Sequence, residues 1–109
     1  MTNLINVTPH VLNIHFGEEV ETLPPSGSVA RCQVTETLVE EINGIPVYET
    51  EFGELSDLPD PAPGVVYVAS MVVAKAAIKA GRTDVRSPGS LLRDADGKPL
   101  GCKGLSLPR

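Results

Sequence analysis

The sequence contains no tryptophan and few other aromatic residues. Aromatic side chains make up 4% of the 109 residues; they are Phe16, Tyr48, Phe52 and Tyr67. Aromatic rings bury the most area per residue, so the core of this protein has to be built from Val, Ile, Leu and Ala. A domain of about 100 residues buries only about two-thirds of its chain surface, and we therefore expect a homo-oligomer.

Long apolar runs and metal-binding patterns are also missing. The longest apolar stretch, 64–74, ends at Lys75 and is shorter than the about 20 residues that a membrane-spanning helix needs. No basic-then-apolar leader follows Met1, which predicts a cytoplasmic protein that does not engage a membrane. Cys32 and Cys102 lie far apart, outside any metal-binding spacing. We therefore expect two free thiols and neither a metal nor another cofactor.

Basic residues are nearly absent from the first 60 positions. Residues 1–60 hold eleven acidic residues and a single basic one, Arg31, whereas residues 61–109 hold three acidic and eight basic residues. The two parts carry charges of −10 and +5, which give the net charge of −5. Either the two parts lie against each other, or the basic part faces an anionic ligand. The acidic balance, and the lack of a basic stretch with interleaved aromatics, exclude general binding to duplex DNA.

Proline and glycine turns divide the chain into strands and one helix. Asn43-Gly44 is a strong hairpin signal and predicts a hairpin of strands 28–42 and 45–54. Further strands are expected at 3–7, 11–16, 18–23 and 65–69, and a second hairpin at 90–93 and 100–105 around Asp96-Gly97. A helix over 70–80 is expected to begin with Ser70 as its cap and to end at Gly81. This order predicts a single α+β domain over 1–109, with a mostly antiparallel sheet, hairpins and one main helix.

The turn at Asn43-Gly44 also predicts which residues of the first hairpin face each other. If Ile42 faces Ile45, one face carries four glutamates, with Glu36 directly opposite Glu51. The four are Glu36, Glu40, Glu49 and Glu51. Like charges that oppose each other destabilise a hairpin. This face is therefore a solvated surface, a docking surface for basic residues, or a weak metal site.

Candidate ligand-binding residues are concentrated in the basic part of the chain. Arg82, Arg86 and Arg93 lie in or beside turns, and arginine suits bidentate contact with phosphate. Ser70 stands where the predicted helix begins, and the free N–H groups of a helix start attract anions. The alternative roles are surface or interface ion pairs for the arginines and a plain helix cap for Ser70.

Three further candidates complete the predicted ligand site. Thr8 and His10 flank Pro9 in a polar turn within an apolar stretch. This turn either bonds its own backbone or contacts a phosphate or a base edge. Tyr67, or alternatively Tyr48, is the candidate to stack on a base. No motif of a nucleophile, a zinc protease or a P-loop is present, so binding is favoured over catalysis.

Six short segments follow one another along nearly the whole chain. They are Asn-Val-Thr-Pro-His (6–10), Pro-Pro-Ser-Gly-Ser-Val-Ala-Arg (24–31), Gly-Val-Val-Tyr-Val-Ala-Ser (64–70), Gly-Arg-Thr-Asp (81–84), Arg-Asp-Ala-Asp-Gly (93–97) and Gly-Cys (101–102). The series resembles a group of small proteins encoded by phages and prophages that open with an Asn-Leu-Thr-Pro-His-like segment. Val7 stands where leucine is usual. The group has no settled activity, so the resemblance implies a context and no catalytic residues.

That context suggests how such a protein would act. Small, oligomeric phage proteins without catalytic motifs include inhibitors of bacterial immunity. Some are sponges that sequester cyclic-nucleotide or cyclic ADP-ribose signals between subunits. Our leading hypothesis is a phage or prophage accessory protein that sequesters a phosphorylated ligand, such as a cyclic nucleotide, in the cytoplasm of the host cell. One alternative is a protein–protein inhibitor that docks the acidic hairpin face on a host factor, and another is a small enzyme acting on a nucleotide.

Overall fold

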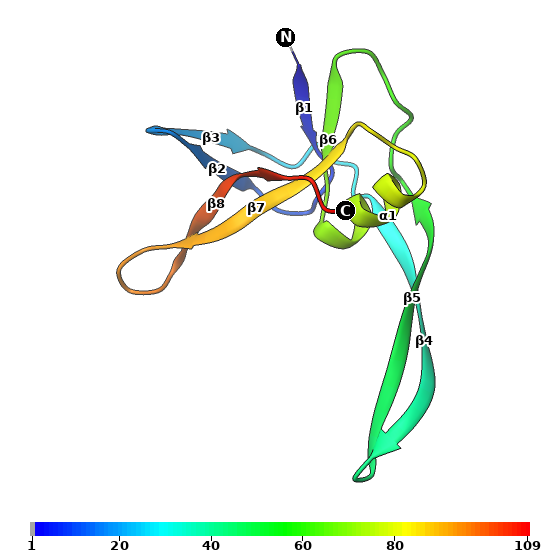
Figure 1. Ribbon diagram of the computed structural model, residues 1–109. Helices are drawn as coiled ribbons and strands as arrows, with labels where there is room; N and C mark the ends of the chain where they lie inside the picture. Colours follow the sequence, from blue (N-terminus) through cyan, green and yellow to red (C-terminus); the bar gives the residue numbers. More distant parts are fainter. Residues whose placement is uncertain (1) are drawn as a thin grey trace.

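The computed structural model describes residues 2–109, which form eight β-strands and one α-helix (Figure 1). In chain order they are β1 (Asn3–Asn6), β2 (Leu12–Phe16), β3 (Glu19–Leu23), β4 (Arg31–Ile42), β5 (Ile45–Ser56), β6 (Val65–Val68), α1 (Met71–Lys79), β7 (Val85–Arg93) and β8 (Pro99–Ser106). Six strands form one sheet in the order β1-β6-β7-β8-β2-β3, and β4 and β5 form a separate pair. The predicted α+β class, with hairpins and one helix, is confirmed. No helix within this range is long and apolar enough to cross a membrane.

The six-stranded sheet is mixed, whereas the sequence predicted a mostly antiparallel one. The pairs β1–β6, β6–β7 and β2–β8 are parallel, and the pairs β2–β3 and β7–β8 are antiparallel. The strand β6 lies between two parallel neighbours and reads Val-Val-Tyr-Val. Such a continuous apolar run is typical of parallel strands that are covered on both faces.

The helix α1 begins and ends as the sequence predicts. The side chain of Ser70 caps its start by accepting a hydrogen bond from the backbone N–H of Val73 at 3.4 Å. At its end, Gly81 takes a left-handed conformation with φ of +99°. The N–H groups of Gly81 and of the next residue donate to the carbonyl oxygens of Ile78 and Ala77. This pair of bonds is a Schellman motif, which satisfies the last carbonyls of a helix.

The hydrophobic core is small and lies between α1 and the β1–β6–β7 side of the sheet. Its buried members are Val7, Ala30, Tyr67, Ala69, Val73, Ala74, Ala77 and Val85. The surface of the helix that points away from this core is open at its start, because Met71 and Val72 are 60% and 40% exposed. The predicted core of small aliphatic residues is therefore confirmed, with Tyr67 as its one aromatic member.

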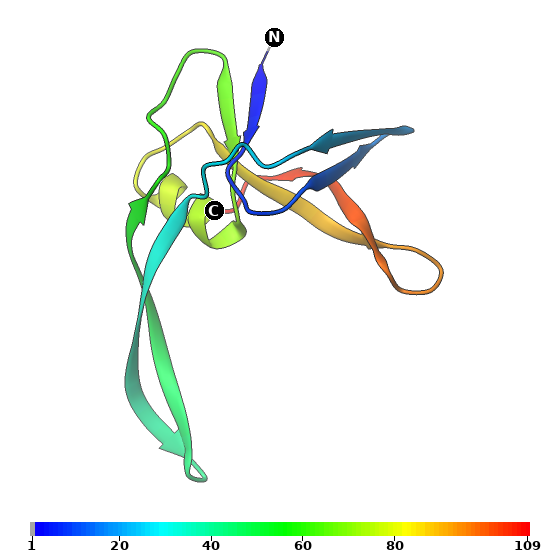
Figure 2. The same cartoon turned by 180° about the vertical axis from the view of Figure 1, so that it is seen from behind.

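The hairpin of β4 and β5 projects from the rest of the molecule, and we call residues 31–56 the arm. Figures 1 and 2 show it leaving the body beside α1 and extending away from the six-stranded sheet. Of its strand residues, Cys32, Val47 and Leu55 are partly buried and none is fully buried. The radius of gyration is 16.3 Å, compared with about 13 Å for a compact chain of this length. The arm accounts for this extended shape.

The turn at the tip of the arm has the predicted form. Ile42 pairs with Ile45, and both turn residues have positive φ, +53° at Asn43 and +79° at Gly44. A type I′ turn requires positive φ at both positions, which explains the Asn-Gly sequence. The predicted hairpin is therefore confirmed.

The register of the arm differs from the prediction beyond its tip. The pairing shifts between Leu38 and Glu40, so that Val39 is an extra residue in β4 and Leu38 pairs with Tyr48. A β-bulge of this kind inserts one residue into one strand and shifts the pairing by one position. Here the shift extends from Leu38 to Val34, and a second irregularity between Val34 and Cys32 restores the register of the tip at the base of the arm. The predicted opposition of Glu36 and Glu51 is therefore wrong. Glu36 pairs with Thr50, and Glu51 pairs with Thr35.

Because of this shift, the middle of the arm has one mainly apolar face and one acidic face. The first face carries the cross-strand pairs Val34–Phe52, Glu36–Thr50 and Leu38–Tyr48. The second face carries the pairs Thr35–Glu51 and Thr37–Glu49. The four apolar residues of the first face, which we call the apolar face, are each between 47% and 53% exposed.

Replacing Gly44 with valine is expected to loosen the arm locally. A β-branched residue resists positive φ, at a cost of about 1–3 kcal/mol. The tip makes no contact with the core, so the cost should appear as faster hydrogen exchange of arm amides, with the melting temperature of the body unchanged. The control is Gly44→Asn, because asparagine tolerates this conformation. Unchanged exchange in Gly44→Val would contradict the turn type.

Candidate functional site

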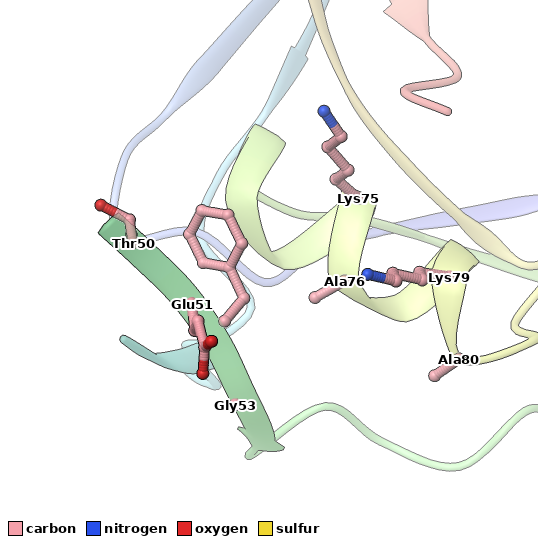
Figure 3. A pocket seen from close by; sticks show the side chains of 8 residues that line it. Thr50, Glu51, Gly53, Lys75, Ala76, Lys79 and Ala80 are labelled. Atoms are coloured by element: carbon pink, nitrogen blue, oxygen red, sulfur yellow. The ribbon is translucent and has the colours of Figure 1, made fainter. Parts of the chain in front are cut away.

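A cleft of about 650 Å³ lies between the arm and the helix. One wall comes from β5 and the other from α1, and the lining residues are Thr50, Glu51, Phe52, Gly53, Lys75, Ala76, Lys79 and Ala80. Figure 3 shows Lys79 extending from the helix towards β5, while Lys75 projects in another direction. The cleft is therefore lined by two lysines, one carboxylate, one hydroxyl and one aromatic ring, and the ammonium group of Lys79 is directed towards β5.

Local structure explains why these residues meet. Lys75 and Lys79 are four residues apart on α1, so they lie one turn apart on the same side of the helix. At the base of the arm, Cys32 and Leu55 pack against the core that the helix also covers. This packing holds the lower part of β5 beside α1 and forms the second wall of the cleft.

The charges lining the cleft have no ion-pair partner. Within residues 2–109 there is one ion pair, between Arg82 and Asp84; Lys75, Lys79 and Glu51 take no part in it. Two lysines four residues apart on a helix repel each other. An anion bound between them would offset that repulsion.

The lining groups match the chemistry of a nucleotide. Ammonium groups attract phosphate oxygens through charge-assisted hydrogen bonds. The ring of Phe52, 51% exposed, offers a flat apolar surface for a base. Glu51 accepts hydrogen bonds and the hydroxyl of Thr50 both donates and accepts them, so both can engage a sugar hydroxyl or a base amino group.

Two of the predicted ligand residues, Thr8 and Ser70, meet in a second hollow. This hollow has a volume of about 270 Å³, lies at the start of α1 and is also lined by Arg31. The hydroxyl of Thr8 donates to Asn6 Oδ1 at 2.6 Å, and the Ser70 side chain caps the helix. Both hydroxyls therefore already have partners within the chain. Arg31 makes no ion pair within residues 2–109.

Arg82 and Arg86 meet in a third hollow, at the other end of α1. This hollow has a volume of about 350 Å³ and also includes Arg109. Two side-chain nitrogens of Arg82 bond the carboxylate of Asp84 at 2.8 Å, and one of them also donates to the carbonyl oxygen of Pro59 at 2.9 Å. The hydrogen bonds from Arg82 lower the pKa of Asp84 below its usual range. Arg82 is thus fixed by its own chain.

Arg86 is held more loosely than Arg82. Its Nη1 atom donates to the carbonyl oxygens of Thr83 at 3.1 Å and Val85 at 2.8 Å. A guanidinium has five N–H donors, so Arg86 keeps donors for another partner. It is the predicted arginine best able to contact a ligand in this hollow.

The remaining predicted residues line neither of these two hollows, although the ring of Tyr67 lies 6.0 Å from the guanidinium carbon of Arg82. Tyr67 is 4% exposed and donates its hydroxyl to the carbonyl oxygen of Asp60 at 3.0 Å, so its ring is closed to a stacking base. Arg93 donates to the carbonyl oxygen of Gly97 in the β7–β8 turn, and His10 is exposed in the loop before β2. The seven predicted residues therefore do not form one site, and their contact with a ligand stays a prediction.

The residues of the arm–helix cleft were not among the predicted ligand residues. The lysine pair was visible in the sequence as a narrow polar stripe on an otherwise apolar helix. Nothing in the sequence placed Phe52 in one cleft with these lysines, because the cleft is formed by segments more than twenty residues apart. No protein-family model, curated protein or solved structure matches the chain, so the resemblance to phage proteins also stays a prediction.

Proposed function

We propose that this protein binds a small phosphorylated ligand of the nucleotide class in the cleft between the arm and α1. The observation that carries this proposal is that Lys75 and Lys79 line the cleft together with Phe52 and have no ion-pair partner among residues 2–109, with Lys79 extending towards β5. The volume of about 650 Å³ lies within the range of about 300–1,000 Å³ that is usual for ligand sites.

The proposed activity is sequestration, in which a ligand is bound and not converted. The sequence contains no catalytic motif, and the resemblance to small phage and prophage proteins favours a nucleotide signal of host defence as the ligand. A cyclic nucleotide fits this chemistry because its phosphates and bases match the lysines and Phe52.

The lysine pair is expected to supply most of the affinity for such a ligand. Replacing both Lys75 and Lys79 with alanine should weaken binding by at least about 100-fold, because each hydrogen bond to a charged group contributes about 1.5–3 kcal/mol. The matched control is Lys98→Ala/Lys103→Ala, which removes the same two positive charges from the turn before β8 and from β8 itself. The measurement is calorimetric titration against cyclic dinucleotides, cyclic trinucleotides and cyclic ADP-ribose isomers.

Other outcomes of the titration would point elsewhere. If Arg86→Ala abolishes binding while the double lysine variant retains it, the ligand lies in the arginine hollow and the cleft proposal is wrong. Equal losses in the double lysine variant and its control would mean that net charge alone controls binding. If the unaltered protein binds none of these ligands at micromolar concentration, the nucleotide proposal fails.

A second candidate function is the inhibition of another protein through the arm. The observation that favours it is the projection of the arm from the body, with its glutamates exposed. This candidate predicts that neutralising Glu49 and Glu51 to glutamine abolishes capture of the partner, whereas the lysine variants retain it.

A further inference from the structure

The apolar face of the arm has no partner within the chain over most of its length. Leu38 and Tyr48 lie near the middle of the arm and are 53% and 52% exposed. An isolated two-stranded hairpin is at best marginally stable in water. A surface that packs against this face would stabilise the arm and remove apolar side chains from water.

The surface area of the chain indicates how large that missing contact is. The chain exposes 7518 Å², about 1,700 Å² more than the roughly 5,800 Å² expected for a compact monomer of this mass. A stable interface buries about 800 Å² on each partner, and obligate dimers bury more. The excess per chain is therefore of the size that an obligate dimer covers.

Charge complementarity favours a second copy of this chain as the occupant. The arm holds six glutamates and one arginine, a charge of −5, and residues 61–109 carry +5. The arm glutamates form no ion pair within residues 2–109. Two arms would repel each other, whereas an arm and the basic part of another copy attract.

An apolar hollow that suits the arm lies mostly on the basic part. This hollow, with a volume of about 310 Å³, lies over β2, β7 and β8. Among its lining residues, Val11, Leu91 and Leu100 are 56%, 55% and 47% exposed. Arg93 pairs with Pro99 at the rim of the hollow, so a cation lies beside the apolar surface.

We propose that the arm of one copy lies across the β2–β7–β8 hollow of a second copy, and that the second arm does the same in return. Leu38 and Tyr48 would pack against Leu91 and Leu100 of the other copy, with arm glutamates near Arg93. A reciprocal contact of this kind closes a two-fold dimer, because the same two surfaces are used on both sides. The proposed dimer does not depend on a ligand in the cleft between the arm and α1.

Sedimentation of paired variants tests whether the apolar face makes the contact. The unaltered protein is expected to be dimeric at micromolar concentration. Leu38→Gln/Tyr48→Gln should raise the dimer dissociation constant at least about 100-fold. The control, Thr35→Gln/Thr37→Gln, alters neighbouring residues on the acidic face and should leave the constant unchanged. A monomeric unaltered protein, or equal effects of both variants, would overturn the proposal.

Cross-linking tests which surface the arm meets. Cys102 itself lines the hollow, so both native cysteines are first replaced, Cys32→Ser and Cys102→Ala. On this background one chain carries Leu38→Cys and another Leu91→Cys, and both are treated with a short bismaleimide. The expected result is a covalent dimer in the mixture that neither variant nor the cysteine-free background forms alone. A dimer from Leu38→Cys alone would show arm-to-arm contact and overturn the proposal. If Leu38→Cys cross-links only to a protein other than this chain, the dimer proposal is overturned and the inhibitor function is favoured.

Discussion

Replacing Gly101 with alanine is expected to cause one of the largest losses of stability that a single methyl group can produce in this protein. Gly101 lies in β8 with φ of +151°, a conformation that side chains rarely adopt. A Cβ atom at this position would overlap the carbonyl oxygen of Asn13. The parallel pairing of β2 with β8 requires that close approach. Alanine would therefore force the two strands apart.

The expected loss is about 2–6 kcal/mol in the free energy of unfolding, because backbone strain and overpacking each cost about 1–3 kcal/mol. This is a large part of the roughly 5–15 kcal/mol that stabilises a typical domain. The matched control is Gly53→Ala, whose Cβ would lie 3.4 Å from its nearest neighbour at an ordinary φ. The measurement is urea denaturation followed by circular dichroism. Equal midpoints for the two variants would contradict the close approach.

Elements that depend on neighbouring residues could be predicted from the sequence. Ser70 and Gly81 determine the ends of the helix, and Asn43-Gly44 determines the turn at the tip of the arm. Each signal acts over a few residues, because it satisfies or constrains backbone groups close to it in the chain.

Features that depend on distant segments could not be predicted in the same way. The parallel pairing of β1 with β6 joins residues about sixty positions apart. The bulge at Val39 changes the pairing of the arm, although no turn residue marks it. The projection of the arm could not be predicted from the sequence either. Its alternation of apolar and polar residues suits a strand in the core of its own chain as well as a strand that another copy covers.

The residues of the candidate site also divide into those that a local sequence pattern indicates and those that distant segments bring together. The lysine stripe on α1 is a local helical pattern and was visible in the sequence. Its partner Phe52 is brought to the cleft by packing at the base of the arm. Among the predicted residues, Thr8 lies in a distinctive turn, but the sequence did not reveal that Asn6 organises this turn.

Asn6 is 2% exposed and bonds three segments of the chain. Its Nδ2 atom donates to the carbonyl oxygens of His10 at 2.7 Å and Leu23 at 3.0 Å. Its Oδ1 atom accepts from the backbone N–H of Thr8 at 2.9 Å and from the Thr8 hydroxyl at 2.6 Å. One amide thus joins the end of β1, the following turn and the end of β3.

Replacing Asn6 with alanine is expected to lower the free energy of unfolding by about 3–5 kcal/mol, because each buried polar group left without a partner costs about 1–3 kcal/mol. Asn6→Asp should be similarly harmful, since a carboxylate keeps the acceptor bonds but loses both donors and faces two carbonyl oxygens. The control, Asn13→Ala, removes the exposed bond from Thr22 to Asn13 at 2.9 Å and should cost less than about 1 kcal/mol. The measurement is again urea denaturation. If Asn6→Asp were as stable as the unaltered protein, the two bonds donated by Asn6 would contribute nothing, and the turn around Thr8 would depend on the bonds that residue 6 accepts.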